Sequence, residues 1–152
     1  MLSLILVAAG LLDVYRLQEA RDWAYRAAEA AAVSGAAQGR DFSTVYHDGQ
    51  VRIDPVLGQA AAEQTLQLEL AQRGLSGATY QIEVSEWGGD AFAGYPPLAR
   101  ADLWNSSDWT PAEPAVGVYV DVPVPTFLLG LVQLHGVHVH AFAVAGLGEG
   151  SE

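Results

Sequence analysis

The chain has 152 residues, 51% of them hydrophobic, and its 18 acidic residues outnumber its seven arginines to give a formal net charge of −11. This length is typical of one domain, and the apolar content is too high for a disordered chain. The negative charge repels phosphate and argues against a nucleic-acid partner. The absence of cysteine excludes disulfides, thiolate metal sites and cysteine nucleophiles.

Charge is distributed unevenly along the chain. Residues 1–40 contain four acidic residues and four arginines, which cancel, whereas residues 41–152 contain fourteen acidic residues and three arginines. The whole net charge therefore lies beyond residue 40. This composition predicts a helical stem over 1–40, apolar and then Ala-rich, and an acidic α+β head domain over 41–152.

The N-terminal segment 1–12 (MLSLILVAAGLL) is uncharged and almost wholly apolar. A helix needs about 20 such residues to cross a bilayer, so twelve are too few alone. A cleavable signal peptide would carry a cation before the apolar run, but the first cation here is Arg16. Two interpretations stay open: a leader has been removed and Met1 is a processed N-terminus, or this end inserts partly in membrane and partly among partner helices.

A long first helix is predicted from Leu2 to about Ala37, where helix formers dominate and Gly10 is the single interruption. At about 1.5 Å per residue it would be roughly 54 Å long and would project from the head. The small side chains of 27–37 permit close approach of another helix, or alternatively of the chain's own sheet. We predict that a subunit interface runs along this helix through its apolar and small residues: Leu4, Ile5, Leu12, Leu17, Ala24, Ala27, Ala31 and Gly35.

The later elements follow from turn and capping signals. Gly39 and Arg40 end the first helix, and Asp48-Gly49 predicts a hairpin turn. A second helix is expected over 55–73, with Asp54 as its N-cap and Gly74 as its C-terminal stop. Alternating apolar residues predict strands at 78–87, 116–124 and 137–145, and Pro123 and Pro125 require that this end of the second strand lies on an edge or leaves the sheet. The predicted fold is therefore α+β: a long projecting N-terminal helix, then a small antiparallel β-sheet head with a second helix.

Candidate metal sites are weak in this sequence. His138 and His140 share one strand face, where Asp121 could complete a zinc site, but without a strong further ligand we interpret them as surface residues. The loop 88–115 concentrates oxygen ligands that suit calcium, although their spacing does not match an EF-hand. These residues are Asp90, Asp102, Asn105, Asp108 and Glu113. We expect no bound metal and no cofactor.

Other features of the head indicate contacts rather than catalysis. Trp104 and Trp109 could stack on sugars, form a mini-core of the loop or contact another protein, and Asn105-Ser106-Ser107 is a formal glycosylation acceptor. The apolar segment 125–136 (PTFLLGLVQLHG) would form a large patch if exposed, which a partner subunit would explain. No nucleophile, phosphate-binding or metalloprotease motif is present in the sequence, so we expect no enzymatic activity.

The segment GLLDVYRLQEARDWAYRAAEAAAVSGA (10–36) resembles the TadE/TadG-like proteins of tight-adherence (Flp-type) pilus systems. Asp13, Arg16 and the run 34–36 (Ser-Gly-Ala) occupy places that match that family's pattern, and the closing VHVHAFAVAGL looks like its terminal strand. Ile5 departs from the Glu of classical type IV pilins.

The resemblance implies a type IV pilin-like, exported subunit. Its N-terminal helix would lie in the membrane before assembly and then pack in a filament of copies of itself or of other pilins at the cell surface. The sequence therefore predicts a structural subunit of an extracellular pilus-like filament or of its assembly apparatus. The alternative is a membrane-anchored accessory subunit whose head binds a ligand or calcium.

Overall fold

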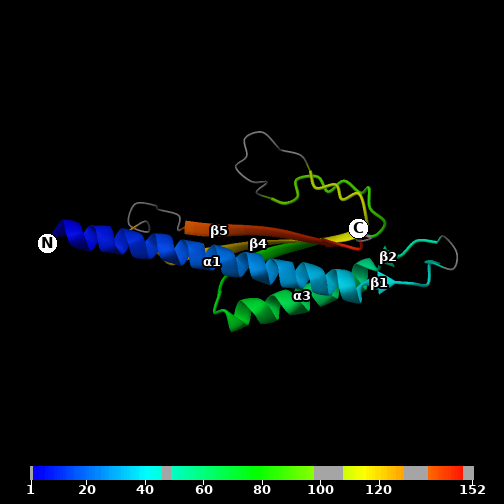
Figure 1. The fold of residues 1–152 in the computed structure, drawn as a ribbon, viewed down its shortest axis with the longest axis horizontal. Coiled ribbons are helices and arrows are strands. Elements are labelled where there is room, and N and C mark those ends of the chain that lie inside the picture. The colour runs from blue at the N-terminus through cyan, green and yellow to red at the C-terminus, as the bar shows by residue number, and fades with distance from the viewer. Residues whose placement is uncertain (1, 46–48, 98–107, 129–136, 149–152) are drawn as a thin grey trace.

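The structure is a computed structural model that describes residues 2–45, 49–97, 108–128 and 137–148, and for residues 2–6 it describes the backbone alone. Its elements in chain order are α1 (Leu2–Gln38), β1 (Arg40–Asp41), β2 (Arg52–Ile53), α3 (Pro55–Gln72), β3 (Thr79–Ser85), β4 (Ala115–Val124) and β5 (Val137–Gly146). Figure 1 shows the two helices beside the strands, with α1 running past one end of the sheet. The predicted α+β class is confirmed, with its long N-terminal helix, second helix and antiparallel sheet.

The main sheet has the order β3-β4-β5, and both pairings are antiparallel. In the central strand β4, alternate residues are valines whose side chains face the helices, and Val116, Val118 and Val120 are fully buried. They pack in one hydrophobic core with alanines of α1 and with Leu66 of α3. This core crosses the compositional boundary at residue 40, because the stem supplies one of its layers.

Pro123 lies in the central strand, where a proline would normally remove a ladder hydrogen bond. The backbone N–H of Leu147 donates to the Pro114 oxygen at 2.9 Å, so even-numbered β4 residues direct their backbone groups toward β5 and odd-numbered ones toward β3. β3 begins at Thr79, opposite Asp121, and so does not extend to Pro123. The expectation that this proline occupies an edge is confirmed for the side of β4 that its nitrogen faces.

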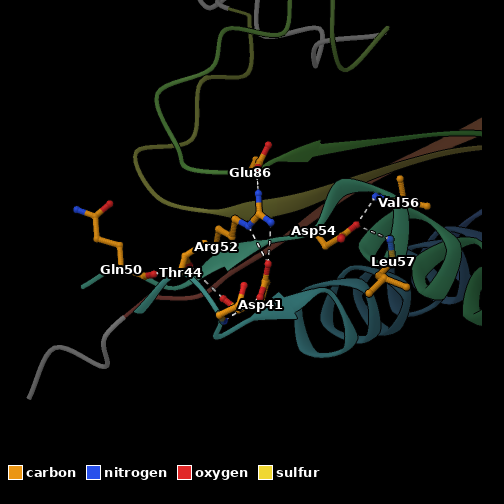
Figure 2. A network of polar contacts seen from close by, with 9 residues as sticks. Asp41, Thr44, Gln50, Arg52, Asp54, Val56, Leu57 and Glu86 are labelled. Atoms are coloured by element: carbon orange, nitrogen blue, oxygen red, sulfur yellow. Dashed lines mark hydrogen bonds and ion pairs between the residues drawn. The ribbon is translucent and has the colours of Figure 1, made fainter. Parts of the chain in front are cut away.

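The second helix begins as the sequence predicts. The Asp54 side chain accepts hydrogen bonds from the backbone N–H groups of Val56 at 2.8 Å and Leu57 at 3.0 Å, while Pro55 occupies the first turn, where no N–H is needed (Figure 2). After the helix, Gly74 takes a φ of +67°, which a residue with a side chain rarely adopts. These two signals bound α3 within one residue of the predicted range.

The hairpin is confined to two residues in each strand, Arg40–Asp41 and Arg52–Ile53, so its ladder lies farther from Asp48-Gly49 than predicted. Asp48 lies outside the described residues. Arg52 joins the hairpin to the main sheet, with an Asp41 carboxylate oxygen 2.8 Å away and the Glu86 carboxylate on its other side (Figure 2). Hydrogen bonds from Ser43, and then from Arg52, lower the pKa of Asp41 to about 2.

The loop after β3 covers the outer face of the sheet. The rings of Phe92 and Trp109 stack at 4.9 Å between centroids, and Tyr95 meets Phe142 of β5 edge to face at 5.5 Å. Gly117 makes room for them, because a Cβ there would lie 3.1 Å from both Trp109 and Tyr95. Trp109 therefore belongs to a mini-core of the loop, which was one of the interpretations of the sequence, whereas Trp104 lies outside the described residues.

Candidate functional site

The predicted subunit interface on α1 divides into two parts with different environments. From Ala20 to Ala36 the helix packs against the sheet and α3, and Ala24, Ala27 and Ala31 are completely buried within the chain. A Cβ at Gly35 would lie only 2.8 Å from the Gly58 oxygen of α3, so the helices approach most closely there.

This burial corrects the interface prediction at Ala24, Ala27, Ala31 and Gly35. These residues have no surface to offer another subunit, because β4 and α3 already fill the space beside them. The alternative that the small residues face the chain's own sheet is the one that holds. A small-residue stripe shows that some backbone comes close, but its spacing carries no information on which chain supplies that backbone.

The N-terminal half of α1 carries an exposed apolar face. Val7, Leu11, Val14 and Tyr15 recur at positions i, i+4, i+7 and i+8 and therefore share one helix face, here called the apolar stripe. Their side chains are between 50% and 66% exposed. Figure 1 shows that this part of the helix extends beyond the end of the strands.

The remaining predicted interface residues lie in or near this half. Leu12 is 52% exposed beside the apolar stripe and so is available to a partner. Leu17 is partly buried against Ala20, Val124 and Val139 of its own chain. The side chains of Leu4 and Ile5 lie outside the described residues.

Asp13 fixes the point at which the helix leaves the sheet. Its side chain is fully buried, and its two carboxylate oxygens accept the backbone N–H groups of Phe127 and Leu128, each at 2.7 Å. The Arg16 guanidinium lies 4.7 Å from the centre of the Phe127 ring. Sequence analysis missed this role. The available signal was an acidic residue next to an apolar run that carries no other charge.

The segment that Asp13 holds is the start of the predicted apolar patch 125–136. Phe127 is 57% exposed and lies next to Arg16 on the protruding half of α1. Residues 129–136 lie outside the described residues, so the full extent of the patch stays a prediction.

The histidine pair lies on the outer face of the sheet as expected. His138 Nδ1 is 2.7 Å from an Asp121 oxygen, and His140 Nδ1 is 2.9 Å from the Tyr119 hydroxyl. Burial, and then the Asp121 charge, raise the pKa of Tyr119. Among the residues that the structure describes, no group of three or more His, Asp or Glu side chains could hold a metal ion.

Two of the loop's described acidic residues accept hydrogen bonds from other parts of the chain. Asp90 accepts a hydrogen bond from the Ser85 hydroxyl at 2.9 Å, and Asp108 accepts one from the Gly94 backbone at 2.8 Å. Asp102 and Asn105, which the calcium and glycosylation hypotheses need, lie outside the described residues.

In comparisons with known proteins, no protein-family model, no curated protein and no solved structure matches the chain. No helix in the described ranges is both long enough and apolar enough to cross a membrane.

Proposed function

We propose that this chain is a structural subunit of an extracellular pilus-like filament or of its assembly apparatus, and that the N-terminal half of α1 joins it to other subunits. The observation that carries the proposal is the exposed apolar stripe on the part of the helix that extends beyond the sheet. Burying one large apolar side chain completely contributes about 1.5–3 kcal/mol, so burial of Val7, Leu11 and Val14 between subunits would favour association.

The two ends of α1 have different surroundings, and this difference supports an assembly role. Residues 20–36 hold the helix on its own body, and Asp13 anchors it where it leaves the sheet. These contacts fix the direction of the helical turns before Asp13, where a neighbouring helix can pack against them. In this proposal the interface comprises Leu4, Ile5 and Leu12 with the apolar stripe, while the acidic head faces the medium and has no enzymatic activity.

The test replaces exposed leucines on the two helices in matched pairs. The double variant Leu11→Gln with Leu12→Gln alters the protruding half of α1, and Leu57→Gln with Leu68→Gln makes the same chemical change on α3, where exposure is similar. The α1 pair should weaken self-association by about tenfold or more, because its side chains become buried between subunits. The α3 pair should assemble like the unmodified chain.

Multi-angle light scattering after size exclusion, with negative-stain electron microscopy, measures the assembly, and thermal melts verify that both variants fold. A full-length chain that stays monomeric at all concentrations contradicts the proposal, as do two double variants that assemble equally well. A monomer that binds lipid vesicles through α1 would instead support the membrane-anchored accessory subunit.

A further inference from the structure

Strand β3 forms one edge of the sheet and pairs with β4 alone among the described strands. Because odd-numbered β4 residues direct their backbone groups toward β3, the odd-numbered residues of β3 receive them. The even-numbered residues Tyr80, Ile82 and Val84 therefore direct one N–H and one C=O each away from the sheet. The hydrogen bond from the Ile53 N–H to the Glu86 oxygen, 3.1 Å long, confirms this direction just beyond the end of the strand.

A groove of about 330 Å³ runs beside this edge. One wall is the first half of α3, which contributes Gln59 and Glu63, and the other is the β3 segment 80–83. The hairpin covers the edge only from Glu86 onward, through the Ile53 hydrogen bond. Within the part of the chain that the structure describes, the groove therefore presents unpaired strand backbone beside a helix, which is a geometry that accepts an additional strand.

The charge in the groove is negative on both sides of the open edge. Glu63 projects from α3, where its carboxylate accepts the Tyr80 hydroxyl at 2.9 Å, and Gln67 donates to the same hydroxyl at 2.9 Å. Glu83 lines the groove from β3 itself, and its side chain alternates to the opposite face of the strand from Tyr80. An added strand would thus meet a carboxylate on each of its faces.

We propose that the outer edge of β3 binds an extended, basic segment of a partner protein, which adds as a fourth strand between β3 and α3. Its backbone pairs with Tyr80, Ile82 and Val84, and its Arg or Lys side chains pair with Glu63 and Glu83. This inference rests on the sheet edge and the groove, so it stands independently of the filament proposal, which concerns the N-terminal half of α1.

A second copy of this chain fits the same edge poorly. Two β3 strands paired edge to edge would bring Glu63 and Glu83 of one copy close to those of the other, and like charges across a strand pair are destabilising. Each copy also carries a net charge of −11. A cationic partner would be attracted to Glu63 and Glu83, whereas an identical copy would be repelled.

The first experiment measures binding of capped heptapeptides to the full chain by isothermal titration calorimetry at low salt. The probe is Val-Arg-Arg-Val-Arg-Arg-Val, which places arginines on both faces of an extended strand, with Val-Glu-Glu-Val-Glu-Glu-Val and Val-Arg-Arg-Pro-Arg-Arg-Val as controls. The first peptide should bind, the acidic one should not, and the proline peptide should bind at least about tenfold more weakly because it cannot complete the ladder. Hydrogen exchange at the amides of Tyr80, Ile82 and Val84 should slow in the complex.

Matched variants separate the backbone contribution from the charge contribution. Val84→Pro removes an outward N–H without removing a β3–β4 ladder bond, so it should abolish binding, while Val84→Ala, which keeps that N–H, should retain it. Glu63→Gln with Glu83→Gln should weaken binding by about tenfold, whereas Glu19→Gln with Glu29→Gln, the same charge change on α1, should have a smaller effect.

Several outcomes overturn the inference. Equal affinity of the proline and valine peptides, or equal loss from both pairs of Glu→Gln changes, would show non-specific attraction to an acidic surface. Unchanged exchange at the three amides in the complex would place the peptide elsewhere. Dimerisation through β3 that Val84→Pro removes, without any binding of the basic peptide, would identify a second copy as the occupant. If Val84→Pro fails to fold by circular dichroism, the glutamine variants and the exchange measurement still decide.

Discussion

At Gly35 the helices α1 and α3 pack so closely that one added methyl group would clash. A Cβ there would lie 2.8 Å from the Gly58 oxygen and 2.9 Å from the Ala62 Cβ, and both of these belong to the packed helix α3 rather than to a flexible side-chain end. Gly10, on the same helix, has room for a methyl group, since a Cβ there would lie 3.8 Å from Leu128 Cδ1, which is an ordinary van der Waals distance.

These two glycines give opposite predictions for the same change. Gly35→Ala should lower the free energy of unfolding by about 1–3 kcal/mol, because it forces α1 and α3 apart. Gly10→Ala should raise it by about 0.5–1 kcal/mol, because alanine restricts the unfolded chain and its Cβ meets Leu128 without a clash. Urea titrations of the two variants measure both values. Equal effects would show that the helices do not approach as closely as the structure places them.

At the scale of the element, one side chain holds α1 and the segment after β4 together. Asp13 accepts two backbone hydrogen bonds from Phe127 and Leu128 while being fully buried, so it replaces the water that those N–H groups would otherwise need. The contact also sets the direction in which the free half of the helix leaves the sheet.

Asp13→Ala should therefore lower the free energy of unfolding by about 2–5 kcal/mol, since two buried donors lose their acceptor at about 1–3 kcal/mol each. Asp22→Ala, at an exposed position of the same helix, should change it by less than about 0.5 kcal/mol. Thermal denaturation followed by circular dichroism compares the two. If Asp13→Ala melts like Asp22→Ala, the buried acceptor contributes little to the fold.

At the scale of the whole molecule, the structural boundary and the compositional boundary fall in different places. Charge divides the chain at residue 40, whereas the hydrophobic contacts of the core begin at about Leu17 and Ala20 of α1. The long helix therefore exposes its apolar stripe near its N-terminal end, whereas its C-terminal end forms a layer of the domain.

Two truncations test this division. A chain that begins at residue 10 keeps Asp13 and every alanine of the core, so it should fold with a melting temperature close to that of the full chain and should associate less. A chain that begins at residue 26 loses Asp13, Ala20 and Ala24, and it should be unfolded or strongly destabilised. Calorimetry of both chains provides the comparison. A stable fold from residue 26 onward would show that α3 and the sheet suffice as a domain.

Local signals in the sequence predicted the elements themselves. Asp54-Pro55 and Gly74 bound α3, and the alternating valines of 116–124 mark β4, because capping and side-chain alternation depend on residues a few positions apart. The exposed apolar run at the N-terminus is visible in the same way. These features required no knowledge of what else the chain contacts.

Tertiary structure decided which surfaces remain available. The sequence spacing of Ala27, Ala31 and Gly35 is the same whether these residues pack against this chain or against another. Only the packing of α3 and β4 shows that their contacts lie within the chain. The partners of Asp13 lie 114 and 115 residues away, and the open edge of β3 exists because no other described strand pairs there. Local sequence constrains local conformation, but which face is buried depends on contacts between distant segments, and no spacing rule encodes these.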